Sequence, residues 1–315
     1  MKNKLISIVI SAYNEEQNIT KLYQELINTT STQQNVEFEF LFVDDGSTDK
    51  TRENILQLQK KDKRVKIVQL KRNFGHEIAM TAGMDYAKGD AVIFMDADLQ
   101  HPPKYIPEMV KLWLKGKEIV LTKRLDNKDT SRFYKLCAKT FYYILNKVSS
   151  TKIMESAPDF RLLDRKYVDF LKGFNEQDRL FRGLLSWIMP NDNVALIEFT
   201  APPRFAGKSK YNFFKSSQLA INSVLQFSVL PLRLATYLGL ITAFLATLLG
   251  IYVFAEHFFL NKPTPGYATI MVTVIFLGAV QLICLGILGE YVGKIHMEVK
   301  KRPLYMADFV ERKDD

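Results

Sequence analysis

Apolar runs of strand length alternate with helical segments along the first 124 residues. Four apolar runs precede four segments with helical spacing, and a fifth run closes the series; the runs lie at residues 5–13, 37–45, 65–71, 90–96 and 118–124. Helices are expected at residues 14–30, 47–60 and 76–89, and from the proline pair at 102–103 to residue 116, with Gly89 as a C-cap. This alternation predicts a mostly parallel, doubly wound α/β sheet.

The last third of the chain has a different pattern. No charged residue occurs in the 22 positions from Leu234 to Ala255 or in the 27 positions from Pro263 to Gly289. Both stretches exceed the roughly 20 residues that cross a bilayer as a helix. A pair of buried core helices is the alternative, but core helices of soluble proteins seldom run so long without a charge. We therefore expect a hairpin of two transmembrane helices, at residues 233–256 and 264–291.

Basic residues flank the two spans and indicate their orientation. Lysine and arginine cluster at 204–233 and at 294–302, whereas the connector at 256–262 carries one lysine. By the positive-inside rule both ends of the hairpin are cytoplasmic and the connector is outside. These flanks account for much of the net charge of +9. Because basic flanks attract anionic lipid headgroups, we expect membrane lipids and no nucleic acid as partners.

Other features of the chain give weaker indications. We expect no signal peptide at the N-terminus, because Lys2 and Lys4 precede only a strand-like run. Cys137 and Cys284 have neither a metal-ligand spacing nor a convincing disulfide partner, which suits a reducing cytosolic face. The basic and aromatic segment at 131–148 is expected to be an amphipathic helix, packed on the domain or lying in the membrane interface.

Two carboxylates directly follow the buried run at 91–95. Asp96 and Asp98 are separated by Ala97, and residues i and i+2 of an extended segment point the same way. The pair can therefore share one hard cation, Mg²⁺ or Mn²⁺, which prefers oxygen ligands and leaves places for substrate phosphates. Gln100 follows closely. The alternative is a strand-end turn with two solvated acids.

Three further polar sites accompany this pair. The loop after the first strand, Ala12-Tyr13-Asn14-Glu15, opens a helix whose backbone N–H groups suit a nucleotide. Asp44 and Asp45 end the second strand. Asp44 is a candidate acceptor for a base N–H and Asp45 for ribose hydroxyls, and an Asx-turn with a helix N-cap is the alternative. Asp159 is an isolated acid after a proline in an apolar context.

Five ordered segments carry a resemblance to a known family. The segments YNEE, VDDGSTD, DADLQHPP, DFRLLDR and RFAGKSKY, followed by two apolar spans, resemble the inverting family 2 glycosyltransferases of the GT-A fold, and most closely the polyisoprenyl-phosphate glycosyltransferases. The resemblance covers essentially the whole chain. One departure is ESAP before DFRLLDR, where a glycine-containing turn is expected, and this leaves the local loop geometry open.

The resemblance implies roles for the candidate residues. Asp159 matches the family's proposed catalytic base, with Asp98 also at the reacting centre, and Asp96 and Asp98 hold the metal. The donor is a nucleotide-sugar and the acceptor a polyprenyl phosphate in the membrane. A phosphomonoester is largely ionised at neutral pH, so Asp159 is alternatively a group that positions the acceptor or shapes the local charge.

Basic side chains are needed where two phosphate groups meet. Arg124 and Arg132 are candidates for the acceptor phosphate because arginine binds phosphate through two N–H groups, although Arg132 is equally well explained as a solvated surface residue. The segment at 204–211 is a candidate to close over the donor diphosphate, or a topogenic cluster, or both; its polar members are Arg204, Lys208, Ser209, Lys210 and Tyr211. The four histidines are scattered, and we assign them no role.

The predicted organisation is a cytoplasmic GT-A domain at 1–211, a juxtamembrane amphipathic helix at 212–232, the two spans, and a cytoplasmic tail at 292–315, in the plasma membrane. UDP-glucose and UDP-N-acetylglucosamine are the leading donors, with GDP-mannose as an alternative. A processive polysaccharide synthase and an inactive scaffold are further alternatives, but the chain lacks a QxxRW-type motif and keeps its acidic sites. Glycines at 289 and 293 and the resemblance predict a homo-oligomer, as a tetramer.

Overall fold

The computed structural model describes residues 4–33, 35–125, 158–174, 176–177, 179, 181–189, 192–202, 230–260 and 266–310. These residues belong to two compact units. The first contains the described residues up to 202 together with 302–310, and the second contains 230–260 and 266–301.

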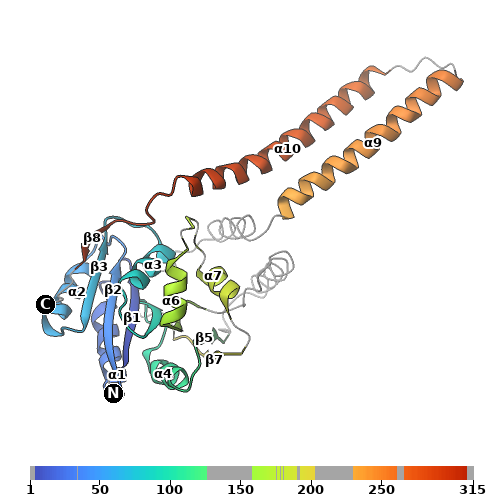
Figure 1. Ribbon diagram of the computed structural model, residues 1–315. Helices are drawn as coiled ribbons and strands as arrows, with labels where there is room; N and C mark the ends of the chain where they lie inside the picture. The colour runs from blue at the N-terminus through green and yellow to red at the C-terminus, as the bar shows by residue number, and fades with distance from the viewer. Residues whose placement is uncertain are drawn as a thin grey trace. The chain divides into compact units, whose positions relative to one another are not determined.

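The first unit is built on one eight-stranded sheet (Figure 1). Its strands follow the order β7-β5-β6-β4-β1-β2-β3-β8, and only β6 and β8 run antiparallel to their neighbours. The predicted α/β fold with a mostly parallel sheet is therefore confirmed. The strands are β1 Lys4–Ala12, β2 Val36–Asp44, β3 Val65–Leu70, β4 Ala91–Asp96, β5 Ile119–Arg124, β6 Arg161–Asp164, β7 Val194–Phe199 and β8 Ala307–Val310.

Helices cover both faces of this sheet because its central strands are apolar on both sides. Along β1, Ile8 packs with one group of helices and Val9 with the other, as expected when successive side chains point to opposite faces. The first group is α1 Ile19–Thr30, α2 Thr51–Lys61 and α4 Ile106–Leu114; the second is α3 His76–Tyr86, α6 Arg165–Lys172 and α7 Phe181–Ile188. A 3₁₀ turn, η1 Pro103–Tyr105, precedes α4.

Several predicted helix ends differ from the structure for local reasons. The first two helices begin at Ile19 and Thr51, later than expected, because the preceding residues form loops bonded to each other. The proposed C-cap at Gly89 is wrong, since α3 ends at Tyr86 and Ala87 is already extended. Gly89 instead lies against β1, where a Cβ would come within 2.5 Å of the Ser7 nitrogen.

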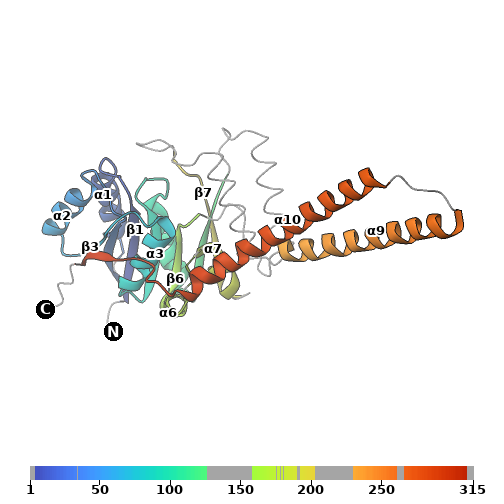
Figure 2. The ribbon, with the colours of Figure 1, turned by 90° about the horizontal axis from the view of Figure 1, so that it is seen from above.

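The C-terminal strand β8 was not anticipated from the sequence. It pairs antiparallel with β3 and covers that edge of the sheet, as Figure 2 shows from above. The Lys71 amide donates to the Met306 carbonyl at 2.9 Å, and the Tyr305 hydroxyl donates to Asp85 at 2.9 Å. Part of the predicted C-terminal tail is thus a strand of the eight-stranded sheet.

The second unit consists of two long apolar helices, α9 Leu230–Leu260 and α10 Tyr267–Val299. Both meet the length and hydropathy of membrane spans, over Leu230–Ala255 and Ile270–Val299. Most of their large apolar side chains are exposed, among them Leu240, Ile275 and Leu282. Exposed apolar surface of this extent indicates association with a membrane.

Candidate active site

The predicted carboxylates meet at one edge of the sheet because of strand direction. Ser11 of β1 is opposite Asp96 of β4, and Ala12 is opposite Asp44 of β2, so three parallel strands end together. β6 runs the other way, with Arg161 opposite Phe94. Asp96 is two residues after Phe94, and Asp159 is two residues before Arg161, so the antiparallel pairing places both acids at the same level. Such an edge is where open α/β sheets bind ligands.

At the end of β2, Asp44 and Asp45 have different partners. Asp44 is fully buried; its Oδ1 accepts from the Ser47 amide at 3.0 Å, and its Oδ2 accepts no hydrogen bond from the described residues. Asp45 accepts from the amides of Phe74 and Gly75 at 2.7 and 2.9 Å. Burial raises the pKa of both carboxyls, although these hydrogen bonds act against it. The Asx-turn is present, and it leaves one buried oxygen of Asp44 as an acceptor.

Tight backbone geometry joins the loops after β1 and β2. Asn14 has φ +54, its amide donates to Ser47 at 2.9 Å, and its Oδ1 accepts from the Thr48 amide at 2.8 Å. The Glu15 amide donates to the Thr51 hydroxyl at 2.7 Å. Gly46 has φ +67, and a Cβ there would lie 2.4 Å from the backbone of Arg72. Ala12 and Tyr13, the other predicted nucleotide contacts of this loop, lie at the same end of β1.

The turn after β4 holds the two candidate metal ligands. Asp96 Oδ1 accepts from the Ser11 hydroxyl at 2.9 Å, and the Ala97 amide donates to the Ser11 carbonyl at 3.1 Å. Asp98 Oδ1 accepts from the Gln100 amide at 3.0 Å, and Leu99 between them has φ +62. A left-handed conformation at a leucine costs energy, and such positions cluster at functional sites.

The Asp96 carboxylate is 32% exposed. Within the described residues, no group of three or more acidic, histidine or cysteine side chains forms a ready-made metal cluster. Two carboxylates with access to solvent fit a divalent cation that takes its other ligands from water and substrate phosphates.

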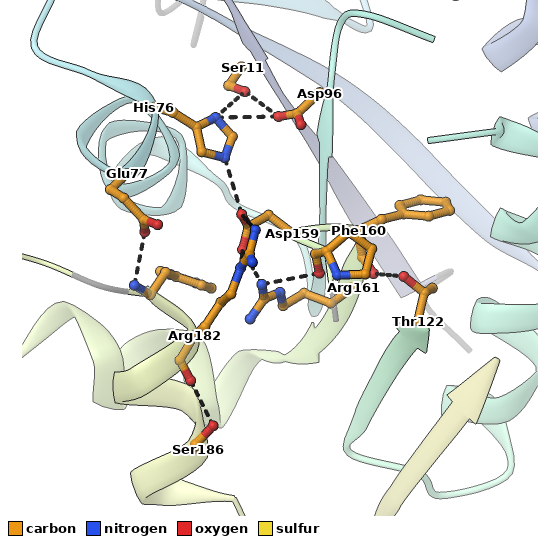
Figure 3. Close-up of polar contacts among 12 residues, drawn as sticks. Ser11, His76, Glu77, Asp96, Thr122, Asp159, Phe160, Arg161, Arg182 and Ser186 are labelled. Atoms are coloured by element: carbon orange, nitrogen blue, oxygen red, sulfur yellow. Dashed lines mark hydrogen bonds and ion pairs between the residues drawn. The ribbon is translucent and has the colours of Figure 1, made fainter. Parts of the chain in front are cut away.

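His76 is the first residue of α3 and lies between Asp96 and Asp159, as Figure 3 shows. Its Nδ1 is 3.0 Å from the Ser11 hydroxyl and 3.3 Å from Asp96 Oδ1, and its Nε2 is 3.4 Å from Asp159 Oδ2. Burial lowers the pKa of this imidazole, but Asp96 and Asp159 outweigh burial and raise the pKa to about 10. His76 is therefore a cation at neutral pH that bridges the two carboxylates.

His101 has the opposite character. It is buried, its Nδ1 accepts from the Asp96 amide at 2.9 Å, and its ring stacks on Phe160 with centroids 5.3 Å apart. Burial lowers its pKa, and an accepting Nδ1 requires the neutral ring. The sequence analysis assigns no role to the histidines, and the structure brings these two into contact with Asp96. Their positions directly after Gly75 and after the DADLQ segment were the available signals.

Asp159 is surrounded by cations. The carboxylate is 4% exposed and contacts Arg161 through Oδ1; Arg182 donates from Nη2 to Oδ2 at 3.0 Å and from Nε to Oδ1 at 3.3 Å. Burial opposes ionisation, but the two guanidinium groups and His76 hold the pKa of this carboxyl well below its usual range. Asp159 is therefore ionised, and both of its oxygens are engaged.

Neighbouring elements fix these arginines in place. Arg161 is 2% exposed, donates to the Pro158 carbonyl at 3.2 Å, and lies 5.3 Å from the centre of the Phe181 ring. Glu77 of α3 accepts from the Phe181 amide at 2.9 Å, which anchors the start of α7 next to Arg182. Sequence reasoning assigned no role to either arginine, although Arg161 is part of DFRLLDR.

The remaining predicted residues fall into two groups. Arg124 ends β5, and the β5–β6 register, with Leu121 opposite Arg161, places it at the same edge as Asp159. Arg132 and the segment members Arg204, Lys208, Ser209, Lys210 and Tyr211 lie outside the described residues.

Comparisons with known proteins identify the family of this chain. The description "Glycosyl transferase family 2" matches residues 7–171, and "GtrB C-terminal hairpin" matches residues 230–295. An uncharacterized glycosyltransferase of Synechocystis is 41% identical over 96% of this chain and 94% of its own length. A bactoprenol glucosyl transferase of prophage origin from Shigella flexneri is 39% identical over 96% of both chains. A prophage bactoprenol glucosyl transferase homolog of Escherichia coli is 36% identical over 98% of this chain and 99% of its own.

One solved structure agrees on the fold. A mycobacterial protein aligns with a TM-score of 0.50 at 17% identity, over 71% of this chain and 75% of its own. At this level of identity the likeness shows the fold alone. Together, the near full-length relatives and the two matched segments show that the chain is a membrane-associated glycosyltransferase of glycosyl transferase family 2, in the polyprenyl-phosphate group that carries the GtrB C-terminal hairpin.

Proposed function

We propose that this enzyme transfers glucose from UDP-glucose to a polyprenyl phosphate in the cytoplasmic leaflet, with inversion at the anomeric carbon. The observation that carries the proposal is the near full-length similarity to bactoprenol glucosyl transferases. The acids that end β2 and β4, and Asp159 before β6, support it, because they lie along one edge of the sheet.

The strand order supports one orientation of the nucleotide-sugar along this edge of the sheet. Asp44 ends β2, with one buried oxygen as acceptor for a base N–H, and Asp45 beside it is a candidate for ribose hydroxyls. From β2 the order runs through β1 and β4 to β6, which is three inter-strand spacings or roughly 14 Å. A nucleoside diphosphate laid along this edge places its diphosphate near Asp96 and Asp98 and its sugar toward Asp159.

Asp96 and Asp98 are the residues that would hold a divalent cation, Mg²⁺ or Mn²⁺. When bound, such a cation supplies Lewis-acid stabilisation of the leaving diphosphate. His101 and Ser11 keep the turn in place through the Asp96 amide and carboxylate. His76 holds the other side of the Asp96 carboxylate and links it to Asp159.

The acceptor needs orientation more than deprotonation. A phosphate oxygen of the lipid attacks the anomeric carbon, the carbon–oxygen bond to UDP breaks, and UDP leaves with the bonding pair. A phosphomonoester has its second pKa near about 6 and is largely dianionic at neutral pH. Asp159, ionised and held by three cations, is suited to organise positive charge around that phosphate.

The apolar hairpin would place the lipid acceptor and the enzyme in the same membrane. The basic flanks predict both termini on the cytoplasmic side and the connector at 256–262 outside. Labelling of Asn261→Cys in intact cells, after removal of Cys137 and Cys284, tests this. Protection of residue 261 together with external access to the C-terminal end would overturn the orientation.

A homo-oligomer, proposed as a tetramer, fits the second span. Apart from the neighbouring backbone of α10 itself, no described atom lies within 4 Å of a Cβ built on Gly289 or Gly293. This small-residue face is therefore open for contact with another helix. A monomeric mass in mild detergent with full activity would count against it.

A donor panel tests the proposed reaction directly. Purified enzyme is incubated with a short polyprenyl phosphate, a divalent cation and, separately, UDP-glucose, UDP-N-acetylglucosamine and GDP-mannose. We expect a glucosyl lipid from UDP-glucose with one sugar per lipid. Transfer only from UDP-N-acetylglucosamine or GDP-mannose would overturn UDP-glucose as the donor. Polymer formation would indicate a processive synthase.

A further inference from the structure

The two arginines that contact Asp159 differ in their access to solvent. Arg161 is 2% exposed and donates to the Pro158 carbonyl, so it is part of the protein interior. Arg182 is 37% exposed, although its carboxylate partner is almost completely buried. A guanidinium that contacts a buried acid and is still more than one third exposed is placed to meet a ligand.

The position of Arg182 is set from several directions. Two of its nitrogens donate to the two oxygens of Asp159, which fixes the plane of the guanidinium group. Its backbone is the first turn of α7, where Glu77 accepts from the adjacent Phe181 amide and Ser186 donates to the Arg182 carbonyl at 2.8 Å. The side chain therefore meets a ligand with little further loss of conformational freedom.

The local charges favour an anion at this place. Two guanidinium groups, those of Arg161 and Arg182, contact the single Asp159 carboxylate. These two guanidinium groups carry one positive charge more than the carboxylate that they both contact, and the nearby Glu77 carboxylate accepts from the Phe181 amide. Because arginine remains protonated at all physiological pH values, this charge is permanent.

We infer that Arg182 binds the phosphate of the lipid acceptor and that Asp159 is the positioning residue that orients it. The inference rests on the proposed function and names a residue for its acceptor subsite. The donor end is less suitable, because Asp44 and Asp45 end β2, whereas Asp159 lies beside β4 on the opposite side of β1. Arg182 is thus separated from the proposed nucleotide position by Asp96 and Asp98.

The chemistry balances without a proton transfer to Asp159. The dianionic phosphate contributes the oxygen that forms the new bond to the anomeric carbon, and UDP takes the electrons of the broken bond. Arg182 and Asp159 are unchanged in charge throughout. Removal of Arg182 should therefore weaken acceptor binding more than donor binding.

The test separates acceptor binding from donor binding in the full-length enzyme. Initial rates are measured against a short polyprenyl phosphate, and the UDP-glucose Kd is measured by calorimetry with Mg²⁺. For Arg182→Gln we expect the acceptor KM to rise about 10- to 100-fold, as for loss of a charge-assisted hydrogen bond, with the donor Kd within about 2-fold of wild type. Arg182→Lys keeps the charge without the planar fork, and we expect a smaller rise in the acceptor KM.

Arg64→Gln is the matched control, because Arg64 also forms a two-pronged pair with an aspartate, Asp62, but precedes the opposite end of β3. We expect unchanged constants for this variant. An unchanged acceptor KM in Arg182→Gln, or a donor Kd that weakens while the acceptor KM does not, would overturn the inference. If Arg182→Gln fails to fold, a wild-type acceptor KM in Arg182→Lys overturns it. Absence of lipid glycosylation by the wild-type enzyme would instead refute the proposed function.

Discussion

Asp96 and Asp159 lie at the same level of neighbouring strands and share one histidine, yet their surroundings differ. Asp96 is 32% exposed and accepts from a neutral hydroxyl and from His76. Asp159 is 4% exposed and faces two arginines as well as His76. The first carboxylate keeps access for an external cation, whereas the second is already neutralised by the protein.

This difference shows that residue type at a strand end does not determine the task of an acid. A base must accept a proton, and the cations around Asp159 hold its pKa well below the usual range. A metal ligand must present lone pairs to a site that a cation reaches, and Asp96 has this access. The two acids therefore suit opposite roles, one toward a bound cation and one toward the protein's own cations.

Loss of a metal ligand should have the largest effect on turnover. For Asp96→Asn or Asp98→Asn we expect a loss of about 10³-fold, about 4 kcal/mol of leaving-group stabilisation. The protein should remain folded and in the membrane. The measurement is glucosyl transfer at saturating divalent cation, with Asp169→Asn, an exposed helix acid, as the control. Full activity of the variants in excess chelator would remove the metal assignment.

Removal of a buried cation should chiefly affect stability. For Arg161→Met, Asp159 loses an interior partner, and breaking such a buried pair costs about 3–5 kcal/mol. The apparent Tm in detergent should fall clearly. In Arg64→Met the lost pair involves an arginine side chain that is 46% exposed, so the cost is about 0–1 kcal/mol. Equal shifts in the two variants would contradict the contrast between the buried and exposed pairs.

The bridge at His76 makes a smaller and pH-dependent contribution to stability. Its pKa is raised to about 10 in the folded protein, above the ordinary value of 6.5. A raised pKa stabilises the fold fully below about pH 6.5, and this contribution is lost as pH rises toward 10. The Tm difference between wild type and His76→Gln should therefore shrink from pH 6.5 to pH 10. A difference that grows over this range would show that the imidazole is not the charged bridge described above.

The sequence predicted the parts of the fold that depend on local pattern. Five strands and the helices between them follow from apolar periodicity, and the two spans from charge-free length. β6 and β8 have only four residues each, and β6 begins with Arg161 and ends with Asp164, so neither has a clear pattern. β8 pairs with β3 across more than 200 residues, which no local signal reveals.

The site, like the fold, was predictable only where a local motif carries it. The acids at the ends of β2 and β4 and the isolated Asp159 were identified from motifs, and the structure brings them to one edge. Their partners come from distant segments: His76 is 83 residues and Arg182 is 23 residues from Asp159. Tertiary packing creates these contacts, and it decides whether a carboxylate is open or neutralised.

The central claim, that Asp159 organises cations and removes no proton, is tested most directly by the pH dependence of Asp159→Asn. The measurement is kcat/KM for the acceptor from pH 5 to pH 9 in this variant and in wild type. We expect a reduced rate that still rises with pH and levels off above about pH 6, the second pKa of the phosphate, as in wild type. Loss of about 10²–10⁴-fold at every pH, without that plateau, would identify Asp159 as the base and contradict the account.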